Sequence, residues 1–350
     1  SGGFTGAADV NTDLVRTYRH PTLYTSGKHS DTESYDNMPL ANRHAECFDC
    51  HDPHRCDNTT AVAPAVYGSL KGVSGISINY NTASFDSWPG DATFTAKLGI
   101  DYQYELCFKC HSYYSYRNNP PDWPSRSGTG YKETDQAKEF SPNNPSYHAV
   151  VGDSKMTQTF EYPAGSGTYY HYGKFTGADR NGNPWSWNSK LYCTDCHGGY
   201  GSSVSGPHGS GETNGQKSIL LGPYYRSATD KYWGTGGSTN NTADSLCYRC
   251  HDKAFYDGTA EGDGTVTVRS KFSNPAVCYN LHKYGGGHEK LACASCHSSI
   301  PHGIHQRGLL VTTADDVRYS VAGRIISFRS IPAPGNWSGS CNNCDTISLH

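Results

Sequence analysis

The chain has 350 residues, of which 35% are hydrophobic and 17% are charged, and its formal net charge is -3 at pH 7. The mean hydropathy is -0.68. This aliphatic content is too small for an ordinary core of that length, and the charged fraction is too low for a disordered chain swollen by charge. The near-neutral balance argues against nucleic acid as a partner, and no apolar run is long enough to predict a transmembrane helix. Something other than side chains must therefore fill the interior.

The expected secondary structure is short and sparse, because 39 Gly and 18 Pro disfavour long helices and long sheets. In chain order, the patterns predict a strand at 77–80, helical turns at 101–114 and 244–255, and strands at 265–269 and 324–328. The remainder is expected to form loops rich in Gly, Ser, Asn and Tyr. No repeat of fixed period and no boundary is evident, so residues 1–350 are expected to form a single unit.

Ten of the fourteen cysteines belong to five copies of the pentapeptide Cys-x-x-Cys-His, whereas random placement predicts roughly 0.03 copies. Two thiols at this spacing add to the vinyl groups of a porphyrin, and the adjacent imidazole then binds the iron as the proximal ligand. Zinc ribbons do not require the His, and a redox dithiol of the thioredoxin type would occur once. The cysteines are Cys47, Cys50, Cys107, Cys110, Cys193, Cys196, Cys247, Cys250, Cys293 and Cys296, and the histidines are His51, His111, His197, His251 and His297.

The five motifs predict five covalently attached haem c groups, which supply the interior that the side chains lack. The expected fold class is therefore a multihaem cytochrome c, mostly loop, with short helices and a few short strands wrapped around a chain of haems. Covalent attachment of this kind takes place outside the cytoplasm. The chain begins Ser1-Gly2-Gly3 without an initiator Met, which we interpret as the start of an exported, processed protein.

Twelve further histidines exceed the five that bis-histidine ligation of five irons requires. The two ligands of one haem have Cα atoms roughly 12 Å apart, and a chain spans at most about 3.5 Å per residue. His54, three residues after His51, is therefore expected to ligate a neighbouring haem, and so is His302, five residues after His297. His208 could reach either its own haem or a neighbour. The other expected distal ligands are His20, His148, His44 and His282, with His29, His171, His288, His305 and His350 as weaker candidates.

Met38 and Met156 are the only methionines, so His/Met ligation can serve two haems at most, and bis-histidine ligation implies low potentials. Four cysteines remain outside the motifs, and an even number in an exported chain suggests two disulfides with three possible connectivities. We favour Cys278 bonded to Cys341 or Cys344, with Cys56 bonded to the other. A sixth, unusual haem at 341–344 is the alternative.

Three stretches of the chain resemble exported multihaem cytochromes with paired Cys-x-x-Cys-His motifs. They are Arg43-His44-Ala45-Glu46 with Cys-His-Asp-Pro-His at 50–54, Cys-Tyr-Asn-Leu-His at 278–282, and Cys-His-Ser-Ser-Ile-Pro-His-Gly at 296–303. The resemblance covers the segments around the first, third and fifth motifs. Some members of this group polymerise into extracellular filaments (nanowires), in which one distal His comes from the adjoining subunit. The resemblance makes His20 a candidate for such a donated ligand.

The expected function is electron transfer through five bis-histidine haems, in a subunit of an extracellular conductive filament. Copies of the chain would then be its own partners, since a head-to-tail contact that does not close makes a fibre. The other partners would be redox proteins or extracellular electron acceptors. One alternative is a monomeric shuttle in the periplasm or at the cell surface. The second alternative is a multihaem reductase, which the surplus of histidines disfavours because an enzyme needs an iron with an open position.

Overall fold

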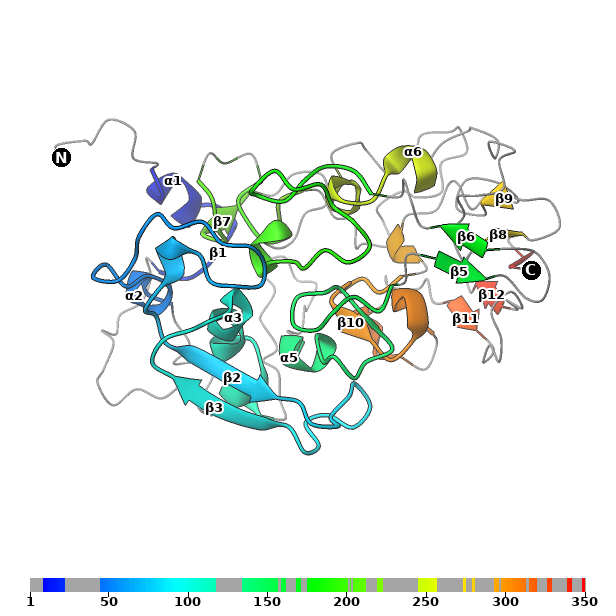
Figure 1. Ribbon diagram of the computed structural model, residues 1–350, viewed down its shortest axis with the longest axis horizontal. Coiled ribbons are helices and arrows are strands. Elements are labelled where there is room, and N and C mark those ends of the chain that lie inside the picture. The colour runs from blue at the N-terminus through cyan, green and yellow to red at the C-terminus, as the bar shows by residue number, and fades with distance from the viewer. Residues whose placement is uncertain are drawn as a thin grey trace. The chain divides into compact units, whose positions relative to one another are not determined.

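The computed structural model describes residues 9–22, 45–117, 134–156, 159–161, 168–170, 175–200, 202, 204–211, 219–222, 245–256, 273–274, 279–280, 293–295, 297–312, 315–319, 326–328, 339–341 and 348–349 (Figure 1). The chain divides into two units. Unit 1 comprises residues 1–153, 190–223 and 302–305, and unit 2 comprises the rest. Both are built from segments that are separated along the sequence.

The described part of unit 1 contains five short helices and three antiparallel strand pairs, β1–β7, β2–β3 and β4–β10. The helices are α1 (Asn11–Leu14), α2 (Cys47–Cys50), α3 (Gln103–Cys110), α4 (Tyr113–Tyr116) and α5 (Gln136–Glu139), with 3-10 turns η2 (Gly68–Leu70) and η3 (Cys193–Asp195). The strands are β1 (Tyr18–Arg19), β2 (Gly75–Asn79), β3 (Thr93–Lys97), β4 (Ser146–Tyr147), β7 (Gly209–Ser210) and β10 (Gly303–Ile304).

Helix α3 carries the second Cys-x-x-Cys-His motif and packs on the β2–β3 hairpin (Figure 1). Phe108, between the two cysteines, is only 1% exposed and joins a core cluster with Ile76 and Phe140. The helix begins where Glu105 accepts hydrogen bonds from the backbone N–H groups of Asp101 and Tyr102, which satisfies donors that a helix start leaves without partners. The motif is therefore fixed to the core by Phe108, one of the two residues between its cysteines.

Helix α5 is anchored to the same hairpin through a buried carboxyl group. Asp135 accepts hydrogen bonds from Trp88 Nε1 at 2.7 Å, from the Tyr113 N–H at 3.0 Å and from the Lys138 N–H at 3.2 Å. Burial raises the pKa of Asp135 to about 7, and these three donors oppose the rise. The carboxyl group thus joins α5 to α4 and to the loop between β2 and β3.

Unit 2 is described in shorter pieces. Its strands are β5 (Thr159–Glu161) paired with β6 (Thr168–Tyr170), β8 (Ser273–Asn274) paired with β9 (Tyr279–Asn280), and a sheet of β11 (Ile326–Phe328), β12 (Gly339–Cys341) and β13 (Ser348–Leu349). Its helical elements are η4 (Leu246–Arg249), α6 (Lys253–Tyr256), η6 (Cys293–Ser295), η7 (Arg307–Leu309) and η8 (Val317–Tyr319).

Most of the secondary structure expected from the sequence lies close to observed elements. Helical turns at 101–114 are confirmed by α3 and α4, and those at 244–255 by η4 and α6, which begin and end within a few residues of the expected bounds. Strands at 77–80 and 324–328 correspond to β2 and β11 with shifted ends. The strand expected at 265–269 lies outside the described residues.

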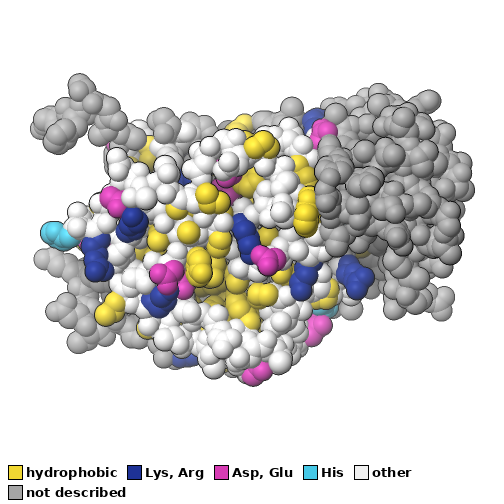
Figure 2. Space-filling model, in the orientation of Figure 1, with side chains coloured by type: hydrophobic (Ala, Val, Ile, Leu, Met, Phe, Trp, Pro, Cys, Tyr) yellow, Lys and Arg dark blue, Asp and Glu magenta, His cyan; other side chains and the backbone are white. Residues whose placement is uncertain are grey.

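Charged side chains of both signs are interspersed over the described face of the molecule in Figure 2, in keeping with the small net charge. Within the described residues, every helix is too short or too polar to cross a bilayer. The expectation of no membrane span agrees with this finding.

Candidate haem-binding sites

All five Cys-x-x-Cys-His motifs form the same single turn. The N–H of each motif histidine donates to the carbonyl of the first cysteine of its motif, over 2.8 Å for His51 and 2.9 Å for His111, His197, His251 and His297. Residues three and four apart lie on one face of such a turn. In the first four motifs both thiols and the imidazole are therefore positioned on one side, where a single porphyrin could meet all three, whereas Cys296 of the fifth motif lies outside the described residues.

The three motif segments of unit 1 contact one another through the residues between their cysteines. The Lys109 Nζ of the second motif donates to the Asp49 carbonyl of the first motif over 3.0 Å, and both side chains are buried. Thr194 of the third motif exchanges hydrogen bonds with Gln103, one turn before the second motif. A hydrogen bond between Cys107 and Cys193 raises the pKa of the Cys107 thiol. The three attachment segments thus form one cluster.

Three pairs of histidine rings lie close together in unit 1, and each pair joins a motif histidine to one of the expected distal ligands. The ring centroids are 6.1 Å apart for His51 and His208, 6.1 Å for His111 and His20, and 5.8 Å for His197 and His302. Two imidazoles on opposite sides of one metal ion, each with a metal–nitrogen bond of about 2.0 Å, have centroids roughly 6 Å apart. The separations fit bis-histidine ligation.

Several of these rings are oriented by hydrogen bonds at Nδ1. His51 Nδ1 lies 2.8 Å from the Ser69 carbonyl, His197 Nδ1 2.9 Å from that of Ile219, and His297 Nδ1 2.6 Å from that of Gly308. The Nδ1 of His20 similarly lies 2.8 Å from the Pro207 carbonyl. Because a carbonyl only accepts, Nδ1 must carry the proton, and the Nε2 lone pair is left to bind a metal ion.

Burial keeps several of these imidazoles in the neutral form that metal binding requires. It lowers the pKa of His197 to about 4, and the adjacent His302 adds to that effect. Burial also lowers the pKa of His208, with a further contribution from His51, and burial lowers that of His297 against the opposing effect of the Gly308 carbonyl.

The distal histidines are presented in pairs by two similar structures, each of which we call a distal module. In the first, β1 runs into His20 and pairs with β7, which follows Pro207-His208, and the His20 N–H donates to the His208 carbonyl over 3.3 Å. In the second, β4 runs into His148 and pairs with β10, which follows Pro301-His302, and the His148 N–H donates to the His302 carbonyl over 2.9 Å. Each module places two histidines opposite each other on antiparallel strands.

Each distal module is completed by a four-residue helix, α1 in the first and α5 in the second (Figure 1). The glycine after the distal histidine lies against a carbonyl of that helix, so a Cβ on Gly209 would overlap the Asp13 carbonyl and a Cβ on Gly303 would overlap the Glu139 carbonyl. The sequence Pro-His-Gly is therefore required twice for the same reason, which is the close approach of the two backbones.

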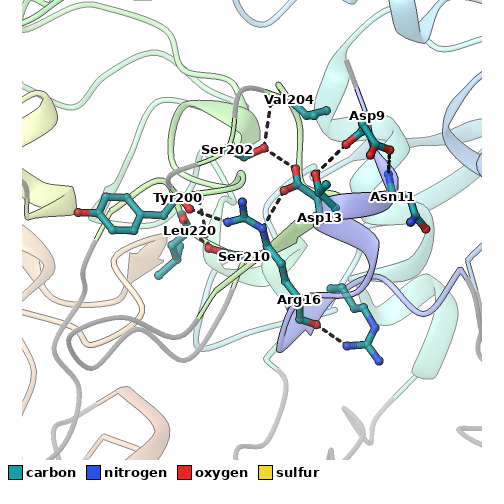
Figure 3. Close-up of polar contacts among 11 residues, drawn as sticks. Asp9, Asn11, Asp13, Arg16, Tyr200, Ser202, Val204, Ser210 and Leu220 are labelled. Carbon is teal, nitrogen blue, oxygen red and sulfur yellow. Dashed lines mark hydrogen bonds and ion pairs between the residues drawn. The ribbon is translucent and has the colours of Figure 1, made fainter. Parts of the chain in front are cut away.

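The buried Asp13 side chain joins α1 to the segment that precedes His208. Figure 3 shows its carboxylate between Arg16 and Ser202, with Arg16 Nε 2.9 Å from Oδ1 and Ser202 Oγ donating to Oδ2 over 2.7 Å. Arg16 also donates to the Tyr200 carbonyl over 2.7 Å. These contacts hold the two sides of the first module together.

The remaining expected ligands are less completely described. His54 is exposed, and within the described residues it lies beside no second imidazole. His251 contacts the rings of Phe175 and Tyr256. His148 is held in the second module, while Cys296, His44 and His282 lie outside the described residues. Cys56 is exposed and not disulfide-bonded within the described part of the chain, and the side chains of its expected partners lie outside that part.

Within the described residues, no group of three or more His, Cys, Asp or Glu side chains could hold a metal ion by itself. Two facing histidines make an incomplete site for a bare ion, whereas a porphyrin supplies the four other nitrogen ligands of an iron. The donor set therefore fits haem better than a bare metal ion.

Comparison with known proteins adds nothing to this interpretation. Neither a family model, nor a curated protein, nor a solved structure matches the chain.

The Gly209 contact yields a test of the first distal module. Substitution Gly209→Ala should force α1 away from β7 and lower the stability of the protein by roughly 1–3 kcal/mol, as overpacking does. The matched control is Gly211→Ala, whose added Cβ would meet no atom within 4 Å. Chemical denaturation of both variants measures the difference, and equal stability would contradict the close approach.

Proposed function

We propose that the chain is a c-type cytochrome that carries five covalently bound haems and transfers electrons between them. The observation that carries this proposal is the set of three histidine pairs in unit 1, each with one histidine from a Cys-x-x-Cys-His motif. Ring centroids 5.8 to 6.1 Å apart fit two axial ligands of one iron. Three such pairs in one unit support the same ligation at three haems.

The roles of the residues follow from the motifs and the geometry. The paired cysteines of each motif would anchor a porphyrin, and the motif histidine would be the proximal ligand. His208, His20 and His302 would be the distal ligands opposite His51, His111 and His197. When bound, each haem supplies one iron that gains or loses a single electron. The backbone carbonyls at Nδ1 hold the rings in place and strengthen their donation.

The second distal module supports a role for one more histidine. His148 has the same position relative to His302 that His20 has relative to His208. By this correspondence His148 would be the distal ligand of a further haem.

Electron transfer is better supported than substrate turnover. At all three paired sites both axial positions would be taken by histidines, so an iron there offers no open position for a substrate. The contacts between the three motif segments also favour closely spaced cofactors, which transfer between haems requires.

We further propose that the protein acts outside the cell or at its surface, as the subunit of a head-to-tail filament. The resemblance of its motif segments to filament cytochromes supports this, and a heterologous contact that does not close yields such a polymer. His20 lies beside His111 of the same chain, so any ligand donated to a neighbour would be a different histidine. Of the expected distal ligands that are described, His54 is the exposed one.

Mass spectrometry tests the haem content. Expressed with the enzymes that attach c-type haem, the chain should gain the mass of five haems, and a Cys247→Ala/Cys250→Ala variant should gain four. A mass equal to that of the bare chain would refute the proposed function.

Distal ligation is tested by three substitutions and one control. Removal of a distal imidazole leaves an iron with one protein ligand, so His20→Ala, His208→Ala and His302→Ala should each convert one haem of five to a high-spin form. Electron paramagnetic resonance of the oxidised protein measures this. The control Leu98→Ala, at a side chain that is 91% exposed, should remain low-spin throughout. An unchanged spectrum for all three histidine variants would contradict the assigned pairs.

Negative-stain microscopy tests the filament. Purified haem-loaded protein should form micrometre-long fibres, and in sedimentation the same protein should behave as a polymer. Isolated particles at every concentration would leave a monomeric electron shuttle as the function instead.

A further inference from the structure

One of the three histidine pairs differs from the others in what holds its distal ring. His302 Nδ1 lies 2.7 Å from Glu139 Oε2, and the Glu139 side chain is 0% exposed. The His302 Nδ1–H group is therefore hydrogen-bonded to a buried carboxylate rather than to a backbone carbonyl.

The position of Glu139 is fixed from several directions. It is the last residue of α5, whose start is capped by Asp135, and its carbonyl accepts a 2.7 Å hydrogen bond from the buried Asn144 side chain. The ring of Phe140 packs against that of His302 in a tilted arrangement, with centroids 4.8 Å apart. The carboxylate and the imidazole thus cannot separate without disrupting the core.

The corresponding acid of the first distal module is used differently. Asp13 is also fully buried, but it is paired with the Arg16 guanidinium at 2.9 Å. The Nδ1 of His208, the counterpart of His302, is buried without a hydrogen-bond partner among the described residues. The second module therefore provides a distal ligand with an anionic acceptor, and the first does not.

Three of the remaining Nδ1 contacts in these pairs involve neutral acceptors. His51, His197 and His20 all donate to backbone carbonyls. Two buried carboxylates near the motifs face a cation, since Asp49 lies 3.9 Å from Lys109 and Glu105 lies 2.9 Å from Lys97. Glu139 is thus the distinguishing charge at its pair of rings.

A carboxylate acceptor makes an imidazole a stronger donor to its metal. A buried negative charge close to an iron also favours the ferric over the ferrous state, since the interior screens charge weakly. Both effects lower the potential at which the iron accepts an electron, because axial donation and nearby hydrogen bonds are the levers that set haem potentials.

We propose that Glu139 lowers the potential of the iron held between His197 and His302, so that this iron is reduced after the one held between His51 and His208. The inference rests on the proposed function. It assigns Glu139 as a tuning residue that acts through His302 and does not itself bind the iron.

The test is Glu139→Gln in the haem-loaded protein. Glutamine keeps the length of the side chain and an acceptor oxygen for the His302 N–H, so it removes mainly the charge. Potentiometric titration followed by electron paramagnetic resonance should show one component shifted to higher potential, and that component should be the one that His302→Ala converts to high spin. The four other components should stay where they are.

The control is Asp153→Asn. Asp153 forms an ion pair with Lys190 at 2.7 Å, and its side chain is 97% exposed. This variant should leave every component unchanged. An equal shift in the control, or no shift in Glu139→Gln, overturns the inference.

A measurement on the unsubstituted protein decides the case if Glu139→Gln fails to fold. The components of unit 1 are identified by the distal-histidine variants, and the His302-dependent one should have a lower potential than the His208-dependent one. The reverse order overturns the inference, and the proposed function still stands if five haems are attached. A chain without haem overturns the proposed function itself.

Discussion

The interaction on which the rest depends is the hydrogen bond between an imidazole Nδ1–H and a fixed acceptor. It settles which nitrogen is protonated, it sets the plane of the ring, and it leaves the Nε2 lone pair available to a metal ion. In this chain the acceptors are mostly carbonyls of loops and turns, such as those of Ser69 and Ile219. A protein with little regular structure can therefore still hold imidazole rings at defined separations, because the loops themselves supply the acceptors.

The distal modules show how few residues this requires. Two residues of strand on each side, a four-residue helix and one glycine place two histidines opposite each other. The buried acid of the helix has a different partner in each module. Asp13 forms an ion pair with Arg16, whereas Glu139 is hydrogen-bonded to His302. The same local fold can thus present ligands of different electronic character.

The sequence predicts a haem chemistry for the site, which stays a prediction, whereas it does not predict which histidine rings lie together. The five motifs stand out because the thioether and axial positions need a fixed spacing, and the short turns at 101–114 followed from local patterns. Chain reach excluded His302 from the haem of its own motif, and the structure brings it to His197. Nothing in the sequence distinguishes Glu139 from a surface acid, and the backbone acceptors carry no signal at all, since any residue has a carbonyl. The exposed His54 remains a prediction without a described partner.

The single backbone bond from the His20 N–H to the His208 carbonyl has a consequence for how such a protein would fail. His20 and His208 share one strand pairing, so a local opening at that point would release both rings together. If the two rings bind different irons as proposed, damage there by proteolysis or heat would affect two haems at once rather than one. Electron transfer through the proposed haems would then depend on the few residues of the β1–β7 pairing.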